Sequence, residues 1–142
     1  VVARGEATIM ELENLNNFIE WQLSMNNAMV EGTFYCPHHP DAGFSGEVKN
    51  LKIICDCRKP DIGLFTQISK NYNINLHKSV MVGDTFSDLL FAQRLGIEFI
   101  LFESSDTCSL AKTSAQKSSK CFVVSSQANL LEILVKLKLE MH

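Results

Sequence analysis

Two closely spaced pairs of metal-binding residue types constrain this chain more than any other feature of its sequence. Cys36 and His38 form the first pair, C-x-H, and Cys55 and Cys57 form the second pair, C-x-C, after sixteen intervening residues. Three thiols and one imidazole are a ligand set of closed tetrahedral zinc sites. The intervening residues include proline and glycine and are typical of a loop. The sequence therefore predicts a zinc loop over residues 36–57.

Two alternatives accompany this interpretation. Buried cysteines that bind nothing are common in proteins, and the neighbouring His39 offers a second imidazole. His38 is favoured as the ligand, because its spacing from Cys36 mirrors the spacing within the C-x-C pair. The chain has five cysteines, an odd number, which fits a metal site in a reducing compartment better than a disulfide framework.

Two cations, Arg58 and Lys59, directly follow the last predicted ligand, and Pro60 comes next. A metal-bound loop would hold these cations in place for an anion. A solvated pair of surface charges is the competing interpretation. A helix is predicted from about Asp61 to Tyr72, and its free N–H groups would also favour an anion near Lys59.

Length and composition place the chain among ordinary globular proteins. Its 142 residues predict one domain with a sizeable core. Apolar residues make up 46% and charged residues 20%, and the formal net charge of −3 gives no basic surface for nucleic acid. No apolar run approaches the ~20 residues of a membrane helix, and the start lacks the pattern of a signal peptide. We therefore expect no nucleic-acid or membrane partner.

The N-terminal half is predicted to contain one long helix and two extended segments. Thr8-x-x-Glu11 is a capping box, so a helix should run from Thr8 to about Met25. Its apolar face, expected to lie in the core, consists of Leu12, Leu15, Phe18, Ile19, Trp21, Leu23 and Met25. The residues from Val30 to Cys36 predict a strand that leads into the zinc loop, and residues 51–54 predict an extended return.

The next segment predicts a strand, a helix and a second strand. Residues 80–82 form a short apolar run that ends at Gly83, and Thr85-x-x-Asp88 can cap the helix that follows. Gly96 suits the end of that helix, and residues 97–102 form another apolar strand. A strand–helix–strand unit of this length predicts an α/β fold with a parallel sheet.

Asp84 should lie at the C-terminal tip of the first of these strands. Acids at such tips face the crevice where α/β proteins bind ligands, so Asp84 is a candidate metal ligand or acid. A turn-forming aspartate is the structural alternative. Asp88 is balanced between capping the helix and supporting a metal ligand.

The C-terminal part is predicted to contain less regular structure. Residues 103–120 are rich in Ser, Thr and Lys and predict a mobile surface connection with a short helix near Leu110. Residues 121–124 predict a last strand, and residues 126–142 predict a final helix. The buried stripe expected on that helix consists of Leu130, Leu134, Leu137 and Met141.

Three stretches together resemble a known family. They are C-P-H-H-P at 36–40, C-D-C-R-K-P at 55–60 and M-V-G-D-x-x-x-D at 81–88. The combination resembles the zinc-containing phosphatases of the haloacid dehalogenase superfamily over nearly the whole chain. V-A-R-G-E-A-T at 2–8 is similar to the family segment that follows its second catalytic motif.

The resemblance implies a Rossmann-like α/β fold and a magnesium-dependent phosphomonoesterase with a structural zinc ion. It implies that Lys59 neutralises phosphate charge, and that Asp84 helps to hold magnesium. Arg58, Lys59 and Thr85 would bind the substrate. The zinc ligands that it implies are Cys36, His38, Cys55 and Cys57.

The chain departs from the family pattern in two ways. The D-x-D that supplies the attacking aspartate and the general acid does not occur in this sequence, nor does the phosphate-binding T-N-Q-S. We therefore expect that one strand–helix unit is missing from the front; the chain opens on Val1 without an initiator Met. Thr85 stands where the family often has Lys.

Three functions compete at this stage. By resemblance the substrate is a heptose bisphosphate, which loses its 7-phosphate on the route to bacterial surface heptose, in the cytoplasm and by a protein that is monomeric when complete. Histidinol phosphate is the substrate of the nearest rival group, which carries the same zinc pattern. A non-catalytic zinc-binding fragment is the third function, because the phospho-enzyme route needs the missing carboxylate.

Overall fold

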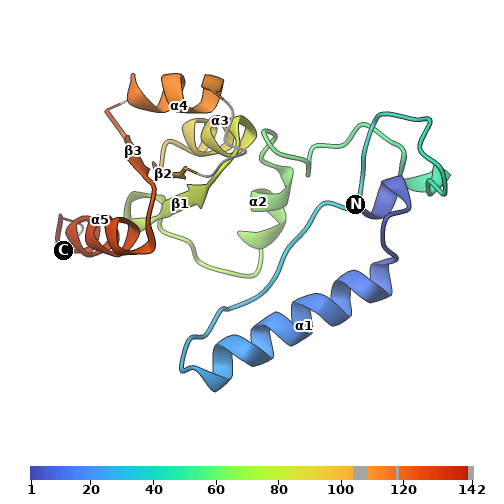
Figure 1. The fold of residues 1–142 in the computed structure, drawn as a ribbon, viewed down its shortest axis with the longest axis horizontal. Coiled ribbons are helices and arrows are strands. Elements are labelled where there is room, and N and C mark those ends of the chain that lie inside the picture. Colours follow the sequence, from blue (N-terminus) through green and yellow to red (C-terminus); the bar gives the residue numbers. More distant parts are fainter. Residues whose placement is uncertain (104–108, 118, 141–142) are drawn as a thin grey trace. The chain divides into compact units, whose positions relative to one another are not determined.

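The computed structural model describes residues 1–103, 109–117 and 119–140 (Figure 1). The chain divides into two compact units, Val1–Arg58 and Lys59–His142. The first unit contains the predicted zinc loop, and the second contains the sheet. The single domain expected from the chain length stays a prediction.

The N-terminal unit contains one α-helix, α1 (Ile9–Met25). The predicted capping box is confirmed, because the Thr8 hydroxyl accepts a hydrogen bond from the Glu11 N–H at 3.1 Å. The Glu11 carboxylate accepts one from the Thr8 N–H at 2.8 Å. The pair satisfies N–H groups that the first turn of a helix leaves without partners. Two short 3₁₀ helices, Val2–Arg4 and Lys49–Leu51, complete the regular structure of this unit.

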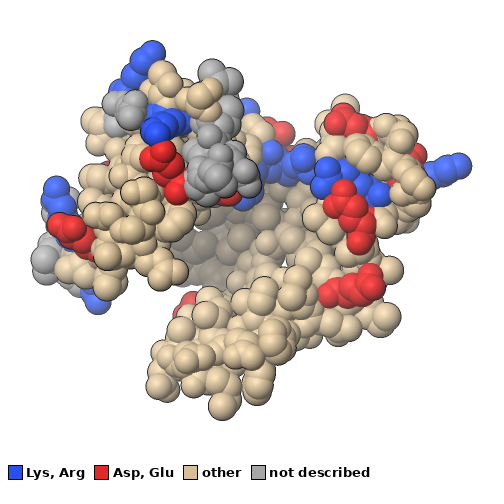
Figure 2. Space-filling model, viewed as in Figure 1, with Lys and Arg blue, Asp and Glu red and all other residues tan. Residues whose placement is uncertain are grey.

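The apolar face of α1 is not buried, which corrects the expectation that it lies in the core. None of the helix residues is buried, and the side chains of Phe18 and Trp21 are 54% exposed. The part of α1 visible in Figure 2 is largely uncharged. The physical reason is that the rest of this unit offers loops and single 3₁₀ turns, and no helix or strand against which α1 could pack.

The two extended segments predicted around the zinc loop are also corrected. Residues 30–36 form no strand, and 3₁₀ helix Lys49–Leu51 precedes an irregular return over 52–54. Valine, threonine and aromatic residues favour strands only where a neighbouring strand supplies hydrogen bonds. Here single backbone bonds tie the loop together: the His39 N–H donates to the Leu51 carbonyl at 3.1 Å, and the Ala3 N–H donates to the Pro37 carbonyl at 3.2 Å.

The C-terminal unit is built on a three-stranded parallel sheet, as the sequence predicted. Its strands are β1 (Val80–Gly83), β2 (Glu98–Phe102) and β3 (Cys121–Val124), in the order β1-β2-β3. In register, Val82 of β1 pairs with Ile100 of β2, and Ile100 pairs with Phe122 of β3. A parallel pair needs a crossover, which α3 (Phe86–Leu95) supplies between β1 and β2.

Helices cover both faces of this sheet (Figure 1). Alternate residues of β2 point to opposite faces, so Phe99 and Leu101 join one apolar cluster while Ile100 joins another. The first cluster includes residues of α3 and of α4 (Ser109–Gln116). The second includes Leu137 of α5 (Gln127–Glu140).

Helix α2 differs from the sequence prediction, whereas the short helix expected near Leu110 is confirmed. Helix α2 covers only Gly63–Ile68, so Lys59 lies four residues before the helix, not directly at its N-terminus. The connection over residues 103–120 contains α4, whose Ala111 and Ala115 are fully buried. Small alanines allow close packing on the sheet, which a composition rich in Ser, Thr and Lys conceals. Residues 104–108 and 118 of that connection, and Met141 of the predicted stripe, lie outside the described residues.

A last 3₁₀ helix, Leu76–Lys78, leads into β1. None of the helices in the described part of the chain has the length and apolar character needed to cross a membrane.

Candidate functional site

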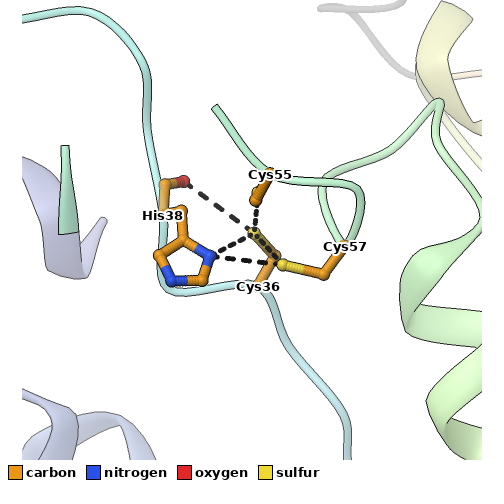
Figure 3. Close-up of side chains that lie close together, drawn as sticks. All are labelled: Cys36, His38, Cys55 and Cys57. Atoms are coloured by element: carbon orange, nitrogen blue, oxygen red, sulfur yellow. Dashed lines mark hydrogen bonds between the residues drawn. The ribbon is translucent and has the colours of Figure 1, made fainter. Parts of the chain in front are cut away.

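The four predicted zinc ligands converge from two chain segments of the N-terminal unit (Figure 3). Their ligand atoms all lie within 4.8 Å of one another. The Cys36 sulfur lies 3.5 Å from the Cys55 sulfur and 3.2 Å from the Cys57 sulfur. The Nδ1 atom of His38 lies 3.2 Å from the Cys57 sulfur and 3.8 Å from the Cys36 sulfur.

These distances fit a tetrahedral zinc ion. With Zn–S bonds of about 2.3 Å, the sulfur atoms of a tetrahedral site lie about 3.8 Å apart. The four distances given above lie between 3.2 Å and 3.8 Å, so a small adjustment of the side chains admits the ion. Cys57 is buried and the other three ligands are half-buried, which is typical of a closed structural site. His39 does not join this cluster.

The protein surroundings set the ionisation of the three thiols differently. Burial, together with the neighbouring Cys36 and Cys55, raises the pKa of Cys57 to about 12. Burial also raises the pKa of Cys36. Burial acts in the same direction on Cys55, but hydrogen bonds from the other two thiols and from the backbone N–H groups of Arg58 and Cys57 outweigh it and lower its pKa. Cys55 is therefore the thiol that ionises first.

Glu47 organises the loop between the two ligand pairs. Its carboxylate accepts hydrogen bonds from the N–H groups of Gly43 at 2.9 Å and Phe44 at 3.1 Å. It also lies 3.7 Å from the ammonium of Lys52, whose side chain is only 7% exposed. That ammonium lies 4.5 Å from the centre of the Phe44 ring, a cation–π contact. The loop thus has a polar core of its own beside the ligands.

A cavity of about 400 Å³ lies beside the ligand cluster within the N-terminal unit. Arg4, Tyr35, His39 and Arg58 form its polar wall, and Cys36 also lines it. Burial lowers the pKa of His39, and the nearby cations Arg58, Lys52 and Arg4 lower it further against the opposing effect of Asp41. Arg4 pairs with Glu6 at 2.9 Å, whereas a guanidinium nitrogen of Arg58 donates to the His38 carbonyl at 3.3 Å. The wall is suited to an anionic ligand.

A second cluster lies in the C-terminal unit, where β1 ends and α3 begins. The Lys59 ammonium lies 2.5 Å from Oδ1 of Asp88, whose side chain is only 4% exposed. Oδ2 of Asp88 accepts hydrogen bonds from the N–H groups of Asp84 at 3.3 Å and Thr85 at 3.1 Å. One buried carboxylate therefore gathers three predicted functional residues at the carboxyl end of a parallel strand. Asp84 itself is exposed to solvent.

The capping role that the sequence suggested for Asp88 is confirmed, whereas its support of a metal ligand stays a prediction. Asp88 caps α3 in a box with Thr85, whose hydroxyl accepts a hydrogen bond from the Asp88 N–H at 3.3 Å. It also holds Lys59. Burial raises the pKa of Asp88, but the Lys59 ammonium and the hydrogen bonds from Thr85 outweigh burial and hold the pKa below its ordinary value. The carboxylate is thus charged at neutral pH and fixes the ammonium beside Asp84.

The structure also contains one contact to this cluster that sequence reasoning missed. Arg94, in the last turn of α3, donates a hydrogen bond to the Pro60 carbonyl at 2.9 Å and pairs with the Asp61 carboxylate. An arginine near a helix C-terminus is favourable through the helix dipole alone, so the sequence carried no signal for its partners.

Comparison with known proteins gives a family match. The profile of the HAD-hydrolase-like family matches residues 56–128, just over half of the chain. The matched region begins between the last two zinc-ligand positions and includes Lys59, Asp84 and Asp88.

Curated relatives share the sequence over a longer region. A D-glycero-beta-D-manno-heptose-1,7-bisphosphate 7-phosphatase of Haemophilus ducreyi is 38% identical over 98 residues, which cover 68% of this chain and 51% of the relative. The protein of the same name from Escherichia coli O6:H1 is 36% identical over 88 residues, or 62% and 44% of the two chains. The chain thus spans about half the length of the curated relatives it matches.

A solved structure is similar over most of the chain. The D,D-heptose 1,7-bisphosphate phosphatase of B. bronchiseptica, complexed with magnesium and phosphate, aligns with a TM-score of 0.70 and 28% sequence identity. The alignment covers 95% of this chain and 69% of that protein.

Proposed function

This chain belongs to the HAD-hydrolase-like family, and from that membership we propose that it acts in a magnesium-dependent phosphomonoesterase. The proposed reaction removes the 7-phosphate of D-glycero-D-manno-heptose 1,7-bisphosphate, on the route to the heptose of bacterial lipopolysaccharide. The observation that carries the proposal is the Lys59 ammonium, held by buried Asp88 beside Asp84 at the carboxyl end of β1. The names of the relatives and of the similar structure support the choice of substrate.

The proposed roles follow from the chemistry of phosphoryl transfer, which depends on positioning and on neutralising charge. Lys59 would bind the phosphate oxygens and neutralise their charge. The exposed carboxylate of Asp84 would hold magnesium, and a bound Mg²⁺ would spread the remaining negative charge. Thr85 would contact the substrate through its hydroxyl. The attacking aspartate implied by the family is not among the residues of this sequence, because no D-x-D occurs in it.

We further propose that Cys36, His38, Cys55 and Cys57 bind one structural zinc ion. The convergence of their ligand atoms supports this, since a cluster of three thiols and an imidazole has the donor set of such sites. The zinc would fix the end of the loop from which Arg58 extends. Arg58, which lines the cavity with Arg4, would contact the substrate.

The proposal also covers the partner, the domain organisation and the cellular location of the protein. The partner is a small phosphorylated sugar, and the two units form one phosphatase domain of a cytoplasmic protein that is monomeric when complete. No nucleic acid or membrane takes part in the proposed reaction.

Phosphate release tests the proposal. The protein expressed from its complete coding sequence should release phosphate from the heptose bisphosphate when Mg²⁺ is present, and more slowly from histidinol phosphate. Lys59→Ala should lower kcat by about 100-fold or more, because a preorganised charge at the reacting phosphate is lost. Lys112→Ala is the matched control: it removes a cation that pairs with Glu103 and belongs to α4, so kcat should not change.

Each contradictory outcome has a separate meaning. Normal turnover by Lys59→Ala would remove Lys59 from the catalytic site. Faster turnover of histidinol phosphate than of the heptose bisphosphate would favour the rival proposal, in which histidinol phosphate is the substrate. No phosphate release with any divalent cation would leave a non-catalytic zinc-binding protein.

A further inference from the structure

We infer that Arg94 is a positioning residue for the proposed reaction, which acts by holding the chain segment that carries Lys59. This inference rests on the proposed function for its effect on turnover. Its structural basis is that α3 holds this segment at two points, one near each end of the helix. Asp88 in the first turn holds the Lys59 ammonium, and Arg94 in the last turn holds the backbone that follows.

The segment needs such contacts because it has no regular structure of its own. Residues 59–62 lie in turns and bends between the predicted zinc loop and α2. Helix α2, which follows, spans six residues and packs only loosely on the other described helices and strands. Lys59 is exposed, with 45% of its side chain open to solvent, so packing does not fix it either. Fixed geometry at Lys59 must come from polar contacts.

Arg94 supplies two of these contacts through a single nitrogen. Its Nη1 donates to the Pro60 carbonyl at 2.9 Å, one residue beyond Lys59, and to the Asp61 carboxylate. Asp88 and Arg94 are six positions apart on one helix, or about 9 Å along its axis. The helix is anchored in the core by fully buried Leu89 and Ala92. A rigid element therefore fixes both the tip of Lys59 and the backbone after it.

This contact should contribute more to turnover than to the stability of the fold. Arg94 and Asp61 are about half exposed, and ion pairs of this kind contribute little to stability. A misplacement of about 1 Å at a reacting centre can cost far more in rate than in stability. Removing Arg94 should therefore slow turnover without unfolding the protein.

Kinetics of three variants and one control variant test the inference. Arg94→Ala should lower kcat about threefold to tenfold, with a thermal midpoint within a few degrees of the parent. Arg94→Lys should recover part of the loss, because an ammonium can reach at least one of the two acceptors. Asp61→Asn, which keeps the Pro60 contact, should lose less than Arg94→Ala. Lys112→Ala, which breaks an ion pair with half-buried Glu103, should keep the kcat of the parent.

A second readout does not depend on catalysis. The acetylation rate of the Lys59 amine, followed by mass spectrometry without substrate, should rise in Arg94→Ala and stay at the parent value in Lys112→Ala. If no variant and no parent protein hydrolyses any phosphate ester, the proposed function fails while this readout still decides the role of Arg94. Unchanged reactivity of Lys59 in Arg94→Ala would overturn the inference, as would an equal loss of kcat in the Lys112→Ala control.

Discussion

Cys57 is the thiol whose protonation opposes the proposed zinc binding most strongly. Its pKa is raised to about 12 by burial and by the two neighbouring thiols, and burial also raises the pKa of Cys36. Only the thiolate binds zinc, so binding must expel these protons. Each expelled proton makes the affinity about tenfold weaker per unit of falling pH. We therefore expect the zinc affinity to rise at least about tenfold per pH unit between pH 6 and pH 8.

Competition with a chromophoric chelator across this pH range measures that slope, and metal analysis should give about one zinc per chain, since four ligands make one closed site. Cys121→Ser is the control, because Cys121 belongs to β3 in the other unit and should leave both values unchanged. An affinity independent of pH would mean that the thiols are ionised before the metal arrives, and would contradict the raised pKa values.

At this scale, the sequence predicted partners that lie close together along the chain. It did not predict partners that only the fold brings together. The ligand pairs were predicted because each pair comes from one short segment, and the structure brings the two pairs together. The contact of Arg94 with Asp61 spans 33 positions, and neither residue type indicates which residue it pairs with. The ion pair of Lys59 with Asp88 was likewise outside the reach of spacing arguments, although both residues belong to family motifs.

At the scale of elements, the junction of β1 with α3 depends on Gly83. A Cβ atom at this position would lie 2.6–2.7 Å from the Cβ, Cγ and Oδ2 atoms of Asp88, closer than real contacts allow. Gly83→Ala should therefore push Asp88 aside, weaken the cap of α3 and release Lys59. Overpacking of this kind costs about 1–3 kcal/mol, which urea unfolding of the C-terminal unit can measure.

A double-mutant cycle isolates the cause of that loss. In an Asp88→Gly background all three clashing atoms are gone, so Gly83→Ala should cost clearly less there than in the parent. Equal costs in both backgrounds would place the strain elsewhere in the turn and would refute the contact with Asp88 as its source.

Elements with strong local signals could be predicted from the sequence. The capping boxes at Thr8 and Thr85 and the left-handed Gly96 with φ of 70° after α3 are confirmed, because side chains and glycine act there on their immediate neighbours. The strand expected over residues 30–36 was wrong, because strand formation depends on a partner that local sequence does not show. The short helix expected near Leu110 is present as α4, and tertiary packing of its two buried alanines supports it.

For the molecule as a whole, the two units differ in the interactions that stabilise each of them internally. The N-terminal unit buries only Val2, Ala3 and Cys57 among its apolar residues. The C-terminal unit has two apolar clusters, one on each face of its sheet. Apolar burial provides most of the stability of ordinary domains. The sheet unit therefore has a core of its own, whereas we expect the order of the loop unit to depend on the proposed zinc ion.

Removing zinc should consequently loosen one unit and spare the other. Zinc binding to small sites contributes an apparent 10–16 kcal/mol, roughly, at neutral pH, which the few buried residues of the loop unit cannot replace. After chelation, hydrogen exchange should show lost protection over residues 36–57, while the amides of β2 at Glu98–Phe102 stay protected. Cys36→Ser should reproduce the chelated pattern without chelator. Retained protection over residues 36–57, once metal analysis confirms removal, would show that Glu47, Phe44 and Lys52 hold the loop unaided. Lost protection in both regions would show that the two units unfold as one.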